Sequence, residues 1–214
     1  MIALLKRLFG AAPAPAPRPD DQGFYATQFV ERPADTQLYV HWAERAPDLK
    51  AEPYDGALGV LSLVRLLGTD AGMAHLGTEQ LSVLGGYLDY VQLQAAKQVI
   101  TQDEQGDFMM VVLQGTLTET RLQPSGERTR LGEARPGDLL GDFSVLDGEP
   151  RVAAWTAVTP VTLAVLSAAT LERMTQDDPR LAAALAVWLG KRVSRRLRQA
   201  SARLGAQITR GTAD

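Results

Sequence analysis

The chain has 214 residues, of which 45% are hydrophobic and 22% charged, and its formal net charge is −3 at pH 7. This is the composition of an ordinary soluble globular protein, long enough for one sizeable domain and an extension. The sequence contains no cysteine. This excludes disulfides, thiolate zinc sites and a cysteine nucleophile, and it fits a reducing, cytoplasmic location.

Residues 1–22 are predicted to be a short apolar peptide followed by a linker. Residues 1–9 are apolar apart from one basic pair, and residues 11–19 are a run of alanine and proline with one arginine. Such a run is typical of a semi-rigid polyproline spacer. Residues 1–9 are therefore a candidate docking peptide for a partner or for peripheral contact with a membrane, and the alternative is a frayed terminus. Their apolar stretch is too short for a signal-peptide core.

Residues 23–72 are expected to form a helical extension. Prolines divide its first part into short pieces. Residues 56–68 are an almost continuous apolar run, too short to span a bilayer, which predicts a helix buried against the domain or against a dimer mate. His41 and His75 each lack a second ligand at metal-binding spacing, so we expect no metal site.

Residues 73–210 are expected to form the main domain. Thr78 is predicted to cap a helix whose apolar stripe runs through Leu81, Leu84, Leu88 and Val91. After Gln94, short apolar runs separated by glycine, aspartate and proline turns predict strands at residues 99–100, 108–113, 117–122, 129–131, 152–158 and 161–166. Closely spaced short strands indicate a small barrel or jelly roll, so the predicted class is α+β.

The C-terminal part is predicted to be a short helix over residues 171–175 and a long one from Pro179 to about residue 207. Residues 179–213 contain eight basic residues and no acidic one, which makes a basic arm on an acidic body. These arginines fit either a solvated helix face or an acidic partner or membrane surface. An apolar seam with spacings of four and three residues predicts a homodimer through this helix; it consists of Val193, Leu197, Ala200 and Leu204.

The stretch 139–153 carries the chemistry of an anion-binding loop. Several backbone N–H groups lie close to Ser144 in the chain, and Gly141 lacks the Cβ that would keep the main chain from a ligand. Arg151 follows Pro150, and its planar fork can bind two phosphate oxygens at once. Asp142 would be repelled by a nearby anion unless it faced a sugar hydroxyl. Together these residues predict a site for a cyclic phosphate attached to a ribose.

Two segments, residues 136–146 and 149–153, resemble the phosphate-binding cassette of the cyclic-nucleotide-binding domain family, which includes the catabolite-activator-like bacterial regulators. The family pattern is Phe-Gly-Glu-Leu-Ala-Leu, a few loop residues, then Pro-Arg and a small residue. Here Asp142 stands where the family has glutamate, so the carboxylate is one methylene shorter. The resemblance extends over about residues 73–204. It implies a β-roll with flanking helices and a long C-terminal helix that covers the base and often pairs two subunits.

The resemblance also implies the role of individual residues. Arg151 would hold the cyclic phosphate together with N–H groups near Ser144, Asp142 would face the ribose, and Val152 would pack near the base. Ser194 on the long helix, or Arg195 or Ser201 instead, is expected to reach the base edge. The expected ligand residues are Gly141, Asp142, Phe143, Ser144, Val145, Arg151, Val152 and Ser194. The expected ligand is cAMP, followed by cGMP or cyclic di-GMP, with no other cofactor.

Two functions remain open. The first is a cyclic-nucleotide sensor that signals to a protein partner, which Arg151, Pro150 and Gly141 favour. The second is a degenerate, ligand-free interaction or dimerisation module, which Asp142 favours. Relatives that act as transcription factors carry a helix-turn-helix domain after the long helix, and this sequence ends at Asp214, so we do not expect sequence-specific DNA binding. The sequence has no P-loop, no kinase, cyclase or phosphodiesterase signature and no Ser-His-Asp set, so we do not expect catalysis.

Overall fold

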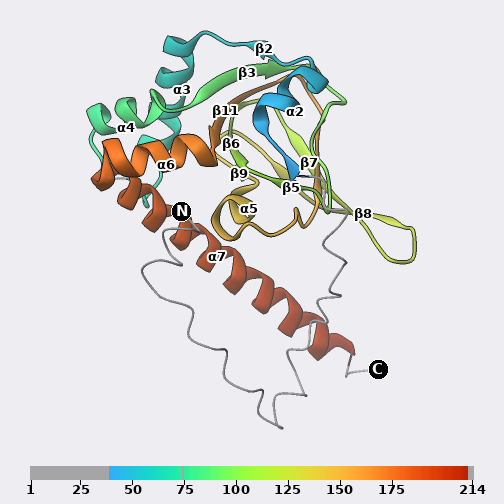
Figure 1. Ribbon diagram of the computed structural model, residues 1–214. Helices are drawn as coiled ribbons and strands as arrows, with labels where there is room; N and C mark the ends of the chain where they lie inside the picture. The colour runs from blue at the N-terminus through green and yellow to red at the C-terminus, as the bar shows by residue number, and fades with distance from the viewer. Residues whose placement is uncertain (1–38, 74, 212–214) are drawn as a thin grey trace, which may run out of the picture.

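The computed structural model describes residues 39–73 and 75–211 (Figure 1). Its centre is a β-roll made of two antiparallel sheets. One sheet has the order β2 (Glu52–Pro53), β3 (Asp89–Leu93), β11 (Val161–Ser167), β6 (Phe108–Gln114) and β9 (Leu139–Leu140). The other has the order β4 (Gln98–Ile100), β10 (Ala154–Ala157), β7 (Leu117–Leu122) and β8 (Arg128–Ala134). A parallel pair joins β1 (Tyr39–Val40) to β5 (Gln105–Gly106).

Strand β6 explains how the core is divided. Alternate side chains of a strand point to opposite faces of the sheet. Phe108, Met110 and Val112 lie in the cluster shared by the two sheets, whereas Met109 and Val111 lie in a second cluster formed with the helices. Because both faces are covered, the whole run is apolar instead of alternating with polar residues.

All but the first of the described helices contribute to the cluster on the outer face of the five-stranded sheet, whereas the first packs through Trp42 and Leu49 into the cluster between the two sheets (Figure 1). They are α2 (Trp42–Leu49), α3 (Gly56–Gly68), α4 (Thr78–Gly85), α5 (Asp142–Asp147), α6 (Ala168–Asp177) and α7 (Pro179–Gly211). The first turns of α7 are anchored by Leu185 and Trp188, which are 2% and 1% exposed. Its C-terminal half leaves the body of the domain. Among the described residues, no helix is both long and apolar enough to cross a membrane.

Most expected elements are present, with differences at their ends. The helix predicted to start at Thr78 is capped by Gly77 and already ends at Gly85, and Val91 belongs to strand β3. Gly85 packs closely against Val60 and the hydroxyl of Tyr90, where a Cβ would lie about 3 Å from both side chains. The strand predicted over residues 152–158 is shorter. The predicted docking peptide, its linker and the first part of the helical extension, residues 1–38, lie outside the described residues.

Candidate functional site

The site begins with a short helix where the sequence predicts a loop. Strand β9 ends at Leu140, Gly141 has a φ of +74°, and α5 follows directly. A Cβ on Gly141 would lie 2.3 Å from Nη1 of Arg151. Both the left-handed backbone and the close approach of Arg151 therefore require glycine at this position.

The side chain of Arg151 is buried, with 3% of the residue exposed. Its Nη1 donates to the carbonyl of Gly141 at 2.6 Å and its Nη2 to the carbonyl of Phe108 at 2.5 Å. The guanidinium lies over the Phe108 ring, 4.9 Å from its centroid. Its Nε is buried and has no hydrogen-bond partner among the described residues. Within the described part of the chain, no carboxylate lies within ion-pair distance of Arg151.

Burial lowers the pKa of Arg151 to about 10, against the opposing effect of nearby carboxylates, of which Glu104 has the largest influence. The guanidinium therefore stays charged at neutral pH. A charge in this position has been removed from water without receiving a bonded counter-ion.

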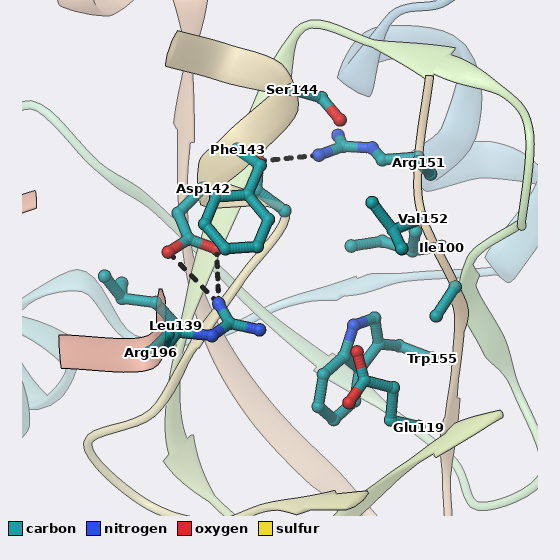
Figure 2. A pocket seen from close by; sticks show the side chains of 12 residues that line it. Ile100, Glu119, Leu139, Asp142, Phe143, Ser144, Arg151, Val152, Trp155 and Arg196 are labelled. Atoms are coloured by element: carbon teal, nitrogen blue, oxygen red, sulfur yellow. Dashed lines mark hydrogen bonds and ion pairs between the residues drawn. The ribbon is translucent and has the colours of Figure 1, made fainter. Parts of the chain in front are cut away.

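A cavity of about 150 Å³ lies beside Arg151 (Figure 2). Six of the eight expected ligand residues line it, namely Gly141, Asp142, Phe143, Ser144, Arg151 and Val152. Six further residues, which are not among the expected ligand residues, also line it, namely Ile100, Glu119, Leu139, Ala153, Trp155 and Arg196.

The two remaining expected residues lie elsewhere. Val145 is 7% exposed and packs in the core cluster shared with the helices. Ser194 lines a separate groove beside Ala71 and Gly72. Of its two alternatives, Arg195 borders the outer cavity described next, and Ser201 is exposed.

A second cavity, of about 510 Å³, opens between β7, β8 and α7. Both cavities are bordered by Glu119, Leu139, Trp155 and Arg196. The side chain of Arg196 therefore stands where the inner cavity meets the outer one.

Arg196 connects α7 to the start of α5. Its Nη1 lies 3.0 Å from Oδ1 and 3.3 Å from Oδ2 of Asp142, which is only 2% exposed. Its guanidinium lies 4.5 Å from the centroid of the Phe143 ring. Figure 2 shows the guanidinium of Arg196 below Asp142 and Phe143.

The segment 104–108 lies between Arg151 and helix α2. The Arg151 N–H donates to the carbonyl of Glu104 at 2.7 Å, and the carboxylate of Glu104 forms an ion pair with Arg45 of α2. Asp107 accepts from the Trp42 N–H at 3.2 Å and contacts His41 Nδ1 at 2.7 Å. The hydrogen bond with Asp107 raises the pKa of His41. No group of three or more acidic or histidine residues in the described chain is arranged to hold a metal ion.

Known proteins share this architecture. Residues 90–178 match the family model of the cyclic nucleotide-binding domain. The chain is 29% identical over 182 residues to the cGMP-dependent protein kinase egl-4 of Caenorhabditis elegans. This alignment covers 78% of this chain and 22% of the kinase. A cyclic nucleotide-binding domain from Methylobacillus flagellatus KT aligns with a TM-score of 0.67 at 21% identity, covering 75% of this chain and 90% of that one. The catabolite activator protein of Thermus thermophilus aligns with a TM-score of 0.56 at 25% identity, and the alignment covers 66% of this chain and 62% of that one.

Residues 90–178 therefore form a domain of the cyclic nucleotide-binding family, folded as its β-roll and followed by a long helix. The expected resemblance and fold class are confirmed. The chain spans about a fifth of the length of the first curated relatives, 22% and 23%. The relatives that are kinases or phospholipases are matched over small shares of their length, 22% and 10%, so most of each of those proteins lies outside the match.

Proposed function

We propose that this protein is a sensor that binds a cyclic nucleotide in the two adjoining cavities and reports it through α7. The observation that carries the proposal is Arg151. It is a buried cation beside a cavity, its side-chain hydrogen bonds go to two backbone carbonyls, and within the described part of the chain its Nε has no partner. Buried charges in proteins are normally paired, because an unpaired one costs several kcal/mol. A bound anion would supply the missing pair.

The other polar residues restrict the kind of anion. Asp142 and Glu119 also line the cavity, and a simple anion such as inorganic phosphate would be repelled by both carboxylates. A suitable ligand combines an anionic group with hydroxyl or N–H donors. In a cyclic nucleotide the phosphate would lie at Arg151 and Ser144, and a ribose hydroxyl would lie at Asp142. Apolar contact would come from Ile100, Leu139, Val152 and Trp155.

The size of the site implies a conformational change. Pockets for drug-sized ligands have volumes of roughly 300–1,000 Å³, whereas the inner cavity has about 150 Å³ and the outer one about 510 Å³. A nucleotide would therefore occupy both cavities, and Arg196 would have to move from the boundary between them. Because Arg196 belongs to α7, this movement would transmit occupancy to the long helix. Charge-assisted hydrogen bonds of about 1.5–3 kcal/mol each are consistent with micromolar affinity.

The identity of the nucleotide is a further part of the proposal. On sequence alone cAMP comes first, with cGMP and cyclic di-GMP behind it. The names of the curated relatives support a cyclic nucleotide as the ligand class, since they include a cGMP-dependent protein kinase and a CRP-like cAMP-activated global transcriptional regulator of Mycobacterium tuberculosis. These names do not choose between the two bases.

We also propose that α7 forms a homodimer and contacts a protein partner. Leu197, which belongs to the apolar seam predicted for this helix, is 66% exposed, and Val187 is 55% exposed. Light scattering at tens of micromolar protein tests the dimer, and a monomeric mass would contradict it. The proposed contact of residues 1–9 with a partner or membrane surface concerns residues outside the described ones.

The second candidate function, a ligand-free interaction module, is favoured by one observation. Arg196 already pairs with Asp142, so the carboxylate that would face the ribose has a partner without any ligand. This reading leaves the unpaired Nε of Arg151 without a role.

Isothermal titration with cAMP, cGMP and cyclic di-GMP separates the two functions. The variants are Arg151→Gln, which removes the charge, and Arg151→Lys, which keeps the charge but loses the fork. Arg135→Gln is the control, since its side chain is 74% exposed and lies outside both cavities. We expect saturable binding by the native chain and by Arg135→Gln, weaker binding by Arg151→Lys and none by Arg151→Gln. Absence of heat with all three ligands would favour the ligand-free module.

A further inference from the structure

Glu119 is a half-buried carboxylate that the proposed phosphate and ribose contacts do not use. It lies on β7 opposite Trp155 of β10 on one side and opposite Gly132 of β8 on the other. Because Gly132 has no side chain, space remains beside the carboxylate, and a Cβ there would lie 3.2 Å from Oε2 of Glu119. The register of β7 and β8 shifts between Glu119 and Thr120. Such irregularities re-aim a side chain and are common beside binding sites.

The position of Glu119 gives the cavity two chemically different ends. Figure 2 shows Arg151 and Ser144 at one end and Glu119 with Trp155 at the other. Glu119 also borders the outer cavity, so it stands where a ligand held at Arg151 by its phosphate would continue outward. Among the described residues no hydrogen bond or ion pair to its side chain is present. A carboxylate here would repel a phosphate, so the part of a ligand that reaches it must carry donors.

The charges facing Glu119 come from α7 and α5. Arg196 stabilises its ionised form, Asp142 opposes it, and burial has the largest effect and raises the pKa of Glu119. Arg192 and Arg195 of α7 line the outer cavity as well. A carboxylate that is desolvated in this way gains most from a ligand that donates two hydrogen bonds to it.

The two common bases differ at the edge that would meet Glu119. Guanine presents two adjacent donors, N1–H and the N2 amino group, which match the two oxygens of one carboxylate. Adenine presents one amino donor next to the acceptor N1, whose lone pair would face a carboxylate oxygen. Glu119 would accept two hydrogen bonds from guanine. With adenine it would accept one and meet one repulsive contact, so it can discriminate between the two bases.

We propose that Glu119 is the base-reading residue of this site and makes the protein prefer cyclic nucleotides with a guanine base, cGMP above cAMP. This inference rests on the proposed cyclic-nucleotide function and replaces the sequence-based ranking of cAMP as the first ligand. A carboxylate bound to two donors of guanine is expected to give about a ten- to hundredfold preference over adenine, since tenfold corresponds to 1.4 kcal/mol.

The test is the ratio of the dissociation constants for cAMP and cGMP, measured by isothermal titration. In Glu119→Gln the second oxygen becomes an NH₂ group that can donate to N1 of adenine, so we expect weaker cGMP binding, stronger cAMP binding and a ratio lowered at least tenfold. Cyclic IMP lacks the N2 amino group of guanine and should bind the native protein between the two. Glu127→Gln removes the same charge from an exposed turn and should leave the ratio unchanged.

The outcomes separate this inference from the function on which it rests. If the native protein binds cAMP and cGMP equally, or if Glu119→Gln shifts both affinities by the same factor, Glu119 does not read the base and the inference is overturned while the sensor function stands. If no cyclic nucleotide binds the native protein, both the sensor function and the inference are overturned. A lower thermal stability of Glu119→Gln by itself would not change the ratio, so a merely structural role is distinguished.

Discussion

Nη1 of Arg196 lies 3.0 Å from Oδ1 of Asp142, although the two residues are 54 positions apart in the chain. The pair joins α7 to the first residue of α5, beside the cavity that contains Arg151. In the proposed function Asp142 also faces the ribose, so a bound nucleotide and Arg196 would use the same carboxylate. This shared partner is the physical link between the site and the long helix.

The first prediction concerns the energy of this pair. Arg196→Gln leaves Asp142 buried without its cation, which lowers the free energy of unfolding. Loss of one partner of a fully buried pair costs about 3–5 kcal/mol. The Arg196 side chain is 40% exposed, so solvent screening reduces the expected loss to about 1–2 kcal/mol. Urea unfolding provides the measurement.

A double-mutant cycle isolates the interaction from other effects of these substitutions. Asp142→Asn combined with Arg196→Gln should recover part of the stability lost in the single variants, because neither group is then left as an unpaired charge. Arg195→Gln, an exposed neighbour on the same helix, is the control. Strictly additive losses would show that the contact contributes nothing to stability.

The second prediction concerns Arg45 of α2, whose ion pair with Glu104 is more deeply buried. The two side chains are 14% and 3% exposed, so Arg45→Gln should lower the free energy of unfolding by about 3–5 kcal/mol. Since Glu104 also accepts from the Arg151 N–H, the substitution should weaken nucleotide binding as well. Lys50→Gln, at the exposed end of α2, should affect neither property.

Trp42 provides a local readout for the same substitution. Its ring lies 5.4 Å from that of Phe108, which in turn lies beneath Arg151. In a background where Trp155 and Trp188 are replaced by phenylalanine, Trp42 fluorescence should move to longer wavelength in Arg45→Gln as α2 separates from the β-roll. An unchanged spectrum would show that α2 remains attached without the ion pair.

The third prediction is a pH dependence of base selectivity. Burial raises the pKa of Glu119 above its ordinary value of 4.5. The carboxylate accepts two hydrogen bonds only when ionised, so the preference for cGMP is complete above this raised pKa and is lost as the pH falls through it. The ratio of the cAMP and cGMP dissociation constants, measured between pH 4 and 8, should therefore decline on the acid side. In Glu119→Gln the ratio should not vary with pH, and an equal decline there would assign the effect to another group.

Much of the fold was predictable because local pattern and burial agree. The apolar run at residues 108–113 and the turns around it indicate a strand in any context, and β6 is found there. The helix expected through Val91 was wrong because its apolar spacing continues beyond Gly85, whereas the helix ends there with Gly86 as its C-cap, and the carbonyl of Gly85 accepts a hydrogen bond from the Tyr90 hydroxyl. The apolar periodicity alone does not reveal where the hydrogen-bonded helix stops.

The residues of the candidate site also fall into two groups, those that one sequence motif brings together and those that only the packing of the elements brings to the cavity. Gly141, Asp142, Ser144 and Arg151 lie in one short motif, so the sequence was sufficient to bring them together. Arg196 was one of several arginines on α7, and only the packing of the helix decides which one meets Asp142. Glu119 and Trp155 face each other across β7 and β10, which required the strand register. The burial of Arg151 against two carbonyls was likewise not visible in the motif.

The most direct test of the central claim is a crystal structure of this protein with cGMP. We predict that the cyclic phosphate lies within hydrogen-bond distance of Arg151, that a ribose hydroxyl contacts Asp142, and that Arg196 no longer occupies the boundary between the two cavities. A nucleotide bound away from Arg151, or a structure grown at saturating cGMP in which Arg196 still pairs with Asp142 and both cavities hold only water, would contradict the account.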